Sequence, residues 1–163
     1  MNVPSESEPQ PTQEARPTQE ARPTCEIRQA LPTDAAAIHA LMRPFVSQHL
    51  LLARNEAEII ELTRHGFVAM QDQRCLGFSA VEIYSPKLAE LQCLAVHPEL
   101  QRSGVGRQLV AQCIERARSL GVMEVLAISS SEDFLRSCGF DFSLPDQKKA
   151  LFYQIRERPF DEH

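Results

Sequence analysis

Residues 94–107 read LAVHPELQRSGVGR and decide the fold. They join an extended apolar run to a helix, which the apolar spacing after Gly104 predicts. Glycines at 104 and 106 let the backbone approach an anion closely, and the first amides of a helix have no internal partner. Because free amides and the helix dipole together bind anions, this stretch predicts a diphosphate loop, with Arg102 and Arg107 adding positive charge.

Two other phosphate loops do not fit these residues. A dinucleotide fold needs a third glycine where this chain has Leu109, and an ATP-binding loop needs Gly-Lys followed by Ser or Thr. A glycine turn that leads into a helix without any ligand stays open as the alternative from spacing alone.

The composition predicts a single globular domain after a short tail. Residues 1–24 hold five of the eleven prolines and a tandem PTQEAR repeat, so we expect a disordered tail there and a folded domain over 25–163. The net charge of −5 argues against nucleic-acid binding. Without a membrane-spanning run or a secretory signal, we expect a cytoplasmic protein that does not bind membranes. The five cysteines are expected to be reduced and free, and their spacing predicts no metal site.

The pattern along the chain predicts an α+β sandwich, a mixed sheet with helices. A short strand over 25–30 precedes a helix that ends at Pro44, and a second helix is capped by Asn55 and ends at Gly66. Extended segments follow over 67–71, 75–84 and 88–96. Next come a helix over 104–120, a buried strand over 124–128, a helix over 131–137, and extended stretches near Phe140 and over 150–155.

At Q-R-S-G-V-G the chain resembles the GNAT family of acetyltransferases, whose acyl-CoA motif is Q/R-x-x-G-x-G/A. The later FLRSCGF is similar to the family's F-Y-x-x-x-G-F landmark. The resemblance implies a mostly antiparallel sheet whose splayed strands bind acetyl-CoA, and an N-acetyltransferase. The residues expected to bind the cofactor are Leu94, Ala95, Val96, Gln101, Arg102, Ser103, Gly104, Val105, Gly106, Arg107 and Phe134. The Leu94 amide would also polarise the thioester carbonyl.

AELQCLAVHP, at 89–98, resembles AELACLAVHP of bacterial N-acetylglutamate synthase acetyltransferase domains. The glutamate of that motif is the general base, which implies this role for Glu90, although a strand glutamate such as Glu82 is often only solvated. The same subfamily implies Ser129 as general acid, with a turn serine as the alternative. The family's usual acidic tyrosine is Leu135 here, and of the two tyrosines, Tyr84 and Tyr153, only Tyr153 is expected near the site.

The subfamily implies an amino-acid acceptor, with arginine biosynthesis as its setting. Arg43 and Arg156 match arginines that bind its carboxylates, and Cys93 is expected on the acceptor side. The acceptor is expected to be glutamate or a relative. Arg156 is followed by Glu157-Arg158 where the subfamily has x-Ser, and a different acceptor, such as glutamine, aspartate or another small amino acid, would fit that change. The chain is expected to lack the kinase-like domain of the full-length enzymes.

Two alternatives stay open: acetylation of another amine, and an inactive CoA-binding sensor. We expect a monomer or a homodimer that pairs through C-terminal strands.

Overall fold

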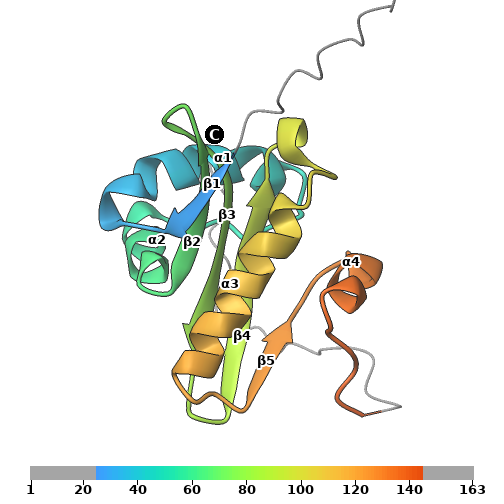
Figure 1. Cartoon of the computed structure of the whole chain (residues 1–163). Helices are drawn as coiled ribbons and strands as arrows, with labels where there is room; N and C mark the ends of the chain where they lie inside the picture. The colour runs from blue at the N-terminus through green and yellow to red at the C-terminus, as the bar shows by residue number, and fades with distance from the viewer. Residues whose placement is uncertain (1–24, 145–163) are drawn as a thin grey trace, which may run out of the picture.

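The computed structural model describes residues 25–144 as one five-stranded sheet with helices on both faces (Figure 1). The strands lie in chain order; β1 to β4 are antiparallel and β5 joins β4 in parallel, which confirms the predicted mixed sheet. The strands are β1 (Glu26–Gln29), β2 (Gly66–Gln71), β3 (Arg74–Ile83), β4 (Leu88–Val96) and β5 (Glu124–Ala127). The helices are α1 (Ala35–Ser47), α2 (Glu56–Thr63), α3 (Val105–Ser119) and α4 (Glu132–Ser137), with short 3-10 turns at Pro32–Asp34 and Pro98–Leu100.

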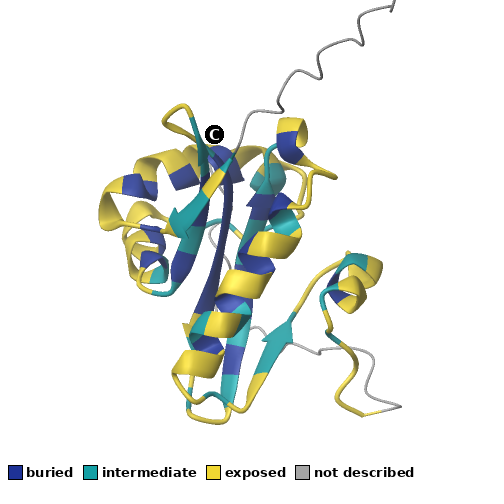
Figure 2. Cartoon of the chain, in the orientation of Figure 1, coloured by how far each residue is buried: buried dark blue, intermediate teal, exposed yellow. Residues whose placement is uncertain are grey.

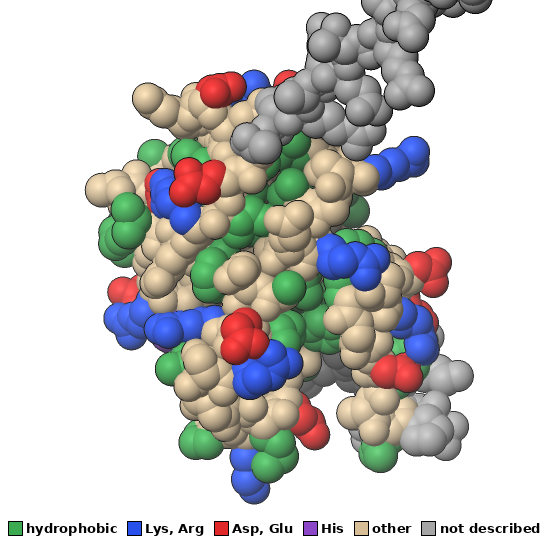
Figure 3. Space-filling model, viewed as in Figure 1, with side chains coloured by type: hydrophobic (Ala, Val, Ile, Leu, Met, Phe, Trp, Pro, Cys, Tyr) green, Lys and Arg blue, Asp and Glu red, His purple; other side chains and the backbone are tan. Residues whose placement is uncertain are grey.

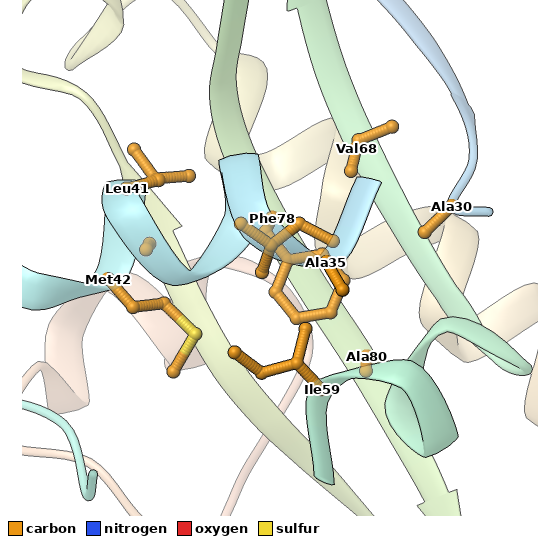
Figure 4. Close-up of a cluster of buried hydrophobic side chains, with 10 residues drawn as sticks. Ala30, Ala35, Leu41, Met42, Ile59, Val68, Phe78 and Ala80 are labelled. Atoms are coloured by element: carbon orange, nitrogen blue, oxygen red, sulfur yellow. The ribbon is translucent and has the colours of Figure 1, made fainter. Parts of the chain in front are cut away.

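The helices cover the sheet with two separate apolar layers. On one face, α1 and α2 pack over Phe78, which is fully buried beside Ile59 and Ala35 (Figure 4). On the other face, α3 buries one stripe, including Leu109, Val110 and Cys113, and turns its polar side outward (Figure 2). Burying a side chain the size of Phe78 contributes roughly 2–3 kcal/mol, so these layers fix the sheet against its helices.

The turns and caps follow the predicted residues. Asn55 accepts the Glu58 amide at 2.9 Å and the Glu58 carboxylate accepts the Asn55 amide at 2.8 Å, which confirms the capping box. Asp72 and Gln73 have φ of 48° and 63°, as a tight hairpin turn requires. Gly121, at φ 73°, follows the last turn of α3 and ends the helix, close to the predicted end at residue 120.

The predicted end of the first helix is wrong. Helix α1 continues through Pro44 to Ser47. Proline removes one backbone donor but leaves its own carbonyl available. That carbonyl accepts the Ser47 hydroxyl and the Gln48 side-chain amide, both at 2.9 Å, and these bonds hold the last turn. Arg43 therefore lies within the helix and not at its end.

Three further sequence expectations differ from the structure. Gly66 does not cap α2, which ends at Thr63; it begins β2, where a Cβ would come within 2.8 Å of the Leu62 carbonyl oxygen. The strand predicted as buried over 124–128 ends at Ala127 and is only half-buried, because it is the edge strand of the described sheet. Phe140 is not in a strand; its amide caps α4 through the Leu135 carbonyl at 3.1 Å. The tail at 1–24 and the stretch at 150–155 lie outside the described residues.

Candidate active site

The middle of β4 changes the pairing of the sheet. Residues 88–91 pair with β3 on one side and with residues 124–127 of β5 on the other. The β3–β4 register then shifts between Phe78 and Ala80, where β4 carries an extra residue, and Cys93 has a φ of 57°. A bulge of this kind re-aims the side chains next to it. Beyond Leu91 no pairing with β5 continues within the described residues, so β4 presents an edge up to Val96.

The predicted diphosphate loop follows this edge directly. The Gln101 side-chain amide donates to the Val96 carbonyl at 3.1 Å and ties the loop to β4. Arg102 and Gly104 have φ of 64° and 90°, which turn the backbone sharply before α3. The first intrahelical bond runs from the Gln108 amide to the Gly104 carbonyl at 3.1 Å. The Val105 amide donates to the Ser103 hydroxyl at 3.5 Å, and the other amides between Gly104 and Gln108 point out of the helix start without a helical partner.

Buried side chains anchor the loop, and the guanidinium of Arg102 has no partner within residues 25–144. Leu100 and Val105 are buried with Leu109, so the loop cannot shift without opening that core. Arg102 is exposed and makes no hydrogen bond or ion pair within residues 25–144. Free amides, left-handed backbone and an uncommitted arginine together suit a diphosphate. The residues present fit the phosphate part of acetyl-CoA.

Phe134 and Val96, which are also predicted cofactor-binding residues, lie beside Gly106 of this loop. A Cβ at Gly106 would lie 3.5 Å from both the Phe134 ring and Val96, so these three line one surface next to the helix start. Arg107 instead turns toward α4, where it donates to the Ser137 carbonyl and, at 3.0 Å, to the Ser137 hydroxyl. Its guanidinium links α3 to α4.

Two carboxylates face each other on the sheet face covered by α1 and α2. Glu82 of β3 and Glu90 of β4 are direct cross-strand partners. Tyr84 donates its hydroxyl to the Glu90 carboxylate across the diagonal of the hairpin. The sequence prediction that Tyr84 lies away from the site is wrong, because the turn at residues 85–87 folds β3 and β4 together at this position.

Tyr84 remains a hydrogen-bond donor over the working pH range. Partial burial, the hydrogen bond to Glu90 and the charges of Glu90 and Glu82 raise the pKa of Tyr84 to about 12. The phenol is therefore neutral at ordinary pH, and its proton lies toward the carboxylate.

Two further residues, Gln92 and Arg54, belong to this cluster and were not predicted from the sequence. The Gln92 side chain is buried and its amide nitrogen donates to Glu82 and, at 3.1 Å, to the Tyr84 hydroxyl. Arg54, just before α2, donates to the Gln92 amide oxygen at 2.8 Å. The two-residue period of the strands was a usable signal for Tyr84 and Gln92. Arg54 lies 38 residues from Gln92 and had no local signal.

Cys93 adjoins this cluster and packs on the core below α1. Its thiol is half-buried, and burial raises its pKa to about 11, against a smaller opposing effect from Arg54. The thiol is therefore protonated at neutral pH.

The other predicted acceptor-side residues lie at the surface or beyond the described chain. Ser129 is exposed, and its hydroxyl accepts the Ser131 amide at 3.0 Å, as in a serine turn. Arg43 is exposed on α1. Arg156 and Tyr153 lie outside the described residues.

The side chains of residues 25–144 limit the kinds of binding site that this part of the chain can form. On the face that carries α3, basic and acidic side chains are interspersed (Figure 3). No group of three His, Cys, Asp or Glu side chains within residues 25–144 is arranged to hold a metal ion. Nor does that part of the chain hold a helix long and apolar enough to cross a membrane.

An open strand edge that leads into a glycine turn at a helix start suits a phosphate-bearing ligand. The sequence model of the acetyltransferase (GNAT) family matches residues 33–140. The chain belongs to this family. It is an N-acetyltransferase, and acetyl-CoA is its co-substrate.

Relatives connect the chain to amino-acid acetyltransferases. It is 33% identical over 114 residues to an uncharacterized N-acetyltransferase of Chlorobaculum tepidum, covering 70% of this chain and 74% of that protein. It is 31% identical over 140 residues to an amino-acid acetyltransferase of Vibrio cholerae, covering 81% of this chain but only 31% of that protein's length. The N-acetylglutamate synthase of Neisseria gonorrhoeae, solved with coenzyme A and N-acetyl-glutamate, superposes with a TM-score of 0.64 at 29% identity. That match covers 72% of this chain and 28% of the synthase.

Proposed function

We propose that this protein transfers the acetyl group of acetyl-CoA to the α-amino group of a small amino acid, glutamate or a relative. The observation that carries the proposal is the position of Glu90. Glu90 lies on β4, and its carboxylate accepts a hydrogen bond from the Tyr84 hydroxyl. The pairing of β4 with β5 ends one residue later, at Leu91. A proton acceptor thus lies beside the strand edge that leads into the diphosphate loop.

The first chemical requirement is a free amine, since an amino acid arrives as its ammonium form. In the proposal Glu90 accepts one ammonium proton, and the neutral nitrogen attacks the carbonyl carbon of the thioester that acetyl-CoA supplies. A C–N bond forms, the C–S bond breaks, and the sulfur leaves with the electron pair. Ser129 is proposed to supply the proton that the sulfur takes up, and the second proton, which the nitrogen loses as the amide forms, restores the Ser129 hydroxyl.

The second requirement is to hold the acyl donor and the acceptor. The backbone of Leu94, Ala95 and Val96 lies on the open edge of β4, and the Leu94 amide is proposed to stabilise charge on the thioester oxygen. The loop residues are proposed to hold the diphosphate: Gln101, Arg102, Ser103, Gly104, Val105, Gly106 and Arg107. Phe134 is proposed to border the cofactor beside Gly106.

On the acceptor side, Arg43 and Arg156 are proposed to bind carboxylates and Cys93 to contact the substrate. A named relative supports an amino acid as acceptor, because the matched protein of Vibrio cholerae is an amino-acid acetyltransferase.

The proposal extends to the protein's setting. It places the domain at 25–163 after a separate tail at 1–24, as a monomer or homodimer working in arginine biosynthesis. A cytoplasmic location is part of the proposal, and all five cysteines are free, as in a reducing compartment.

The test is free-thiol release from acetyl-CoA in the presence of each amino acid, a polyamine and a peptide with a free N-terminus. Release with glutamate, glutamine or aspartate alone supports the proposal. Release only with the polyamine or peptide contradicts the acceptor class. Tight CoA binding without release for any acceptor contradicts the enzyme activity and identifies a sensor.

A further inference from the structure

A cation borders the polar cluster on β3 and β4, and the proposed chemistry does not use it. Arg54 lies just before α2, and its guanidinium donates to the Gln92 amide oxygen at 2.8 Å. We propose that Arg54 binds the α-carboxylate of the acceptor amino acid and so determines which amines the enzyme accepts. This inference rests on the proposed function and adds a binding residue that the sequence did not predict.

Arg54 is part of the wall of a pocket between α2 and the end of β3. The pocket has a volume of about 360 Å³, which is within the range of small-molecule sites. Glu82 lines the same pocket, and Glu90 is its direct partner on the neighbouring strand. A cation and a carboxylate in one pocket complement the carboxylate and the ammonium of an amino acid.

Arg54 keeps donors that no oxygen of the protein accepts. A guanidinium carries five N–H groups, and within residues 25–144 the Gln92 oxygen is the one oxygen at hydrogen-bond distance from it. The Arg54 Nε is buried without a hydrogen-bond partner, and its Nη1 lies 3.9 Å from the Glu58 carboxylate, which is too long for a hydrogen bond. Buried donors without partners destabilise a fold. Stability alone therefore does not explain an arginine at this position.

The surroundings of Arg54 hold its guanidinium in place. Asn55 and Glu58 form the capping box that fixes the backbone next to it. The side chain of Gln92 is buried, so its bond to Arg54 is shielded from water. The positive charge of Arg54 also reaches the Cys93 thiol at the bulge of β4. A side chain fixed in this way loses little freedom when a ligand binds.

The spacing between Arg54 and the two carboxylates suits the α-carbon end of an amino acid. The Gln92 amide bridges this gap, because its oxygen accepts from Arg54 and its nitrogen donates to Glu82. The same nitrogen lies 3.4 Å from Glu90. An amide carries its oxygen and nitrogen on one carbon, and an α-amino acid carries its carboxylate and amine on neighbouring carbons. An amino acid beside Gln92 therefore reaches Arg54 with its α-carboxylate and the carboxylate pair with its ammonium.

The other charged groups that line the pocket do not compete for this place. Arg64 and Glu61 form an ion pair at 3.3 Å, and both side chains are largely exposed. Glu58 is held by the capping box and makes no hydrogen bond to Arg54. His65 is neutral at pH 7, because burial and two nearby arginines lower its pKa. Arg54 is thus the half-buried cation of the pocket that lacks a hydrogen-bonded carboxylate.

The experiment compares acceptors that differ in one carboxylate. Thiol release from acetyl-CoA is measured with glutamate, glutamine and the α-amide of glutamate, for the parent, Arg54→Gln and Arg54→Lys. Arg118→Gln is the matched control, because Arg118 lies at the far end of α3. Calorimetry of glutamate binding to each protein saturated with CoA gives a second readout that needs no turnover.

We expect Arg54→Gln to raise the KM for glutamate and glutamine by about 30-fold, and to weaken glutamate binding equally. The value of kcat should stay within about threefold, because the bond to the carboxylate is made equally before and during acetyl transfer. The α-amide lacks the anion, so its KM should change by less than about threefold. Arg54→Lys keeps the charge but loses the paired donors, and a rise of about tenfold is expected. Arg118→Gln should behave as the parent.

A further variant separates binding by Arg54 from support of the cluster through Gln92. Gln92→Ala introduces the alanine of the synthase-like AELACLAVHP and removes the contact with Arg54. We expect the KM for glutamate to rise only about threefold, because Arg54 keeps its own donors. A rise as large as that of Arg54→Gln would mean that Arg54 acts only through Gln92, and it would overturn the inference.

The outcomes separate this inference from the proposed function. If the parent acetylates amino acids and Arg54→Gln keeps the KM and the affinity for glutamate, the inference is overturned and the proposed function stands. A parent that releases no thiol with any amino acid overturns the proposed function, and the inference with it. A raised KM for glutamate beside an unchanged KM for glutamine contradicts the α-carboxylate as the bound group. If Arg54→Gln does not fold, Arg54→Lys decides by the same comparison of glutamate with its α-amide.

Discussion

The two halves of β4 differ in pairing, and that difference separates two tasks. Residues 88–91 are bonded to β3 and β5, so Glu90 projects from a strand that is fixed on both sides. Residues 92–96 are bonded to β3 and have no β5 partner among the described residues, so their other edge is available. The bulge at Cys93 lies near the start of the second half. A rigid half holds a side chain for proton transfer, and an open half offers backbone groups to a ligand.

The largest effect is expected in the paired half, from Glu90→Gln. The amide keeps the shape of the side chain and accepts the Tyr84 hydrogen bond, but it cannot take a proton. General-base removal typically costs about 10²–10⁴-fold, so we expect kcat to fall by that range. The measurement is steady-state thiol release, together with CoA binding by calorimetry, which should be unchanged.

Glu82→Gln is the matched control for that variant, because Glu82 is the opposed carboxylate of the same pair. We expect it to lower kcat much less. Equal losses of kcat in the two variants would show that the two carboxylates act together as the proton acceptor, and not Glu90 alone.

The next effect concerns the loop that continues the open half. Gly104 has a φ of 90°, and a Cβ there meets nothing within 4 Å, so replacing it costs backbone conformation and not space. A non-glycine residue pays about 1–2 kcal/mol in the left-handed region. We expect Gly104→Ala to weaken CoA binding about tenfold, with kcat at saturating acetyl-CoA nearly unchanged.

Gly121 offers a matched control at the other end of the same helix. Its φ is 73° and a Cβ there also meets nothing within 4 Å. Gly121→Ala should lower the unfolding free energy as much as Gly104→Ala does, without any change in CoA affinity. A loss of CoA affinity in both variants would mean that α3 as a whole, and not the loop, controls binding.

The sequence predicted the loop that continues the open half more completely than the surroundings of Glu90 in the paired half. The loop, its glycines and the start of α3 form one contiguous stretch, and local spacing was sufficient to place them. Glu90 was also predicted, but by resemblance to a motif. Its surroundings were not, because Arg54 reaches Gln92 across 38 residues and Tyr84 reaches Glu90 around a hairpin. Contacts of that kind depend on register and packing, which local patterns do not encode.

The same reason explains the errors at helix ends. The sequence predicts that Pro44 ends the helix because proline lacks a backbone donor. In the structure the Pro44 carbonyl accepts from the Ser47 hydroxyl and the Gln48 amide, and α1 continues. The sequence predicts that Gly66 ends the second helix. In the structure glycine is needed there because a Cβ would meet the Leu62 carbonyl and the Phe78 ring. In both cases a neighbour in space decided the outcome.

A smaller effect should separate the two arginines of the loop. Arg102 is exposed and makes no ion pair or hydrogen bond within the described chain, whereas Arg107 is bonded to Ser137. We expect Arg102→Ala to weaken CoA binding about fivefold at low salt, and less at 0.5 M salt because screening reduces the attraction. Arg107→Ala should weaken CoA binding less, because its guanidinium is already bonded to Ser137, and should also lower the melting temperature, since it releases α4 from α3.

Titration of CoA at two salt concentrations checks both variants, with Arg118→Ala as the control. Arg118 lies at the far end of α3 and is paired with Glu115. A salt-dependent loss in Arg107→Ala equal to that of Arg102→Ala would show that its bond to Ser137 gives way to the ligand.

The smallest effect is expected at Cys93, where the two halves meet. A thiol beside an acyl donor suggests a covalent acetyl-enzyme, but a nucleophilic cysteine needs its thiolate. Burial raises the pKa of Cys93 to about 11, so the thiolate is scarce at pH 7 and grows only as the pH approaches that value. We therefore expect direct attack by the amine, and a kcat in Cys93→Ala within about threefold of the parent.

Mass spectrometry of the protein after incubation with acetyl-CoA alone should show no acetyl group on Cys93. Cys75→Ala is the control, because burial also raises the pKa of Cys75 to about 11 and its side chain lies at the start of β3, away from the bulge. An acetylated Cys93, with a hundredfold loss in Cys93→Ala and none in Cys75→Ala, would make the bulge the reacting centre. The open half of β4 would then supply the nucleophile, and Glu90 would serve the thiol in place of the amine.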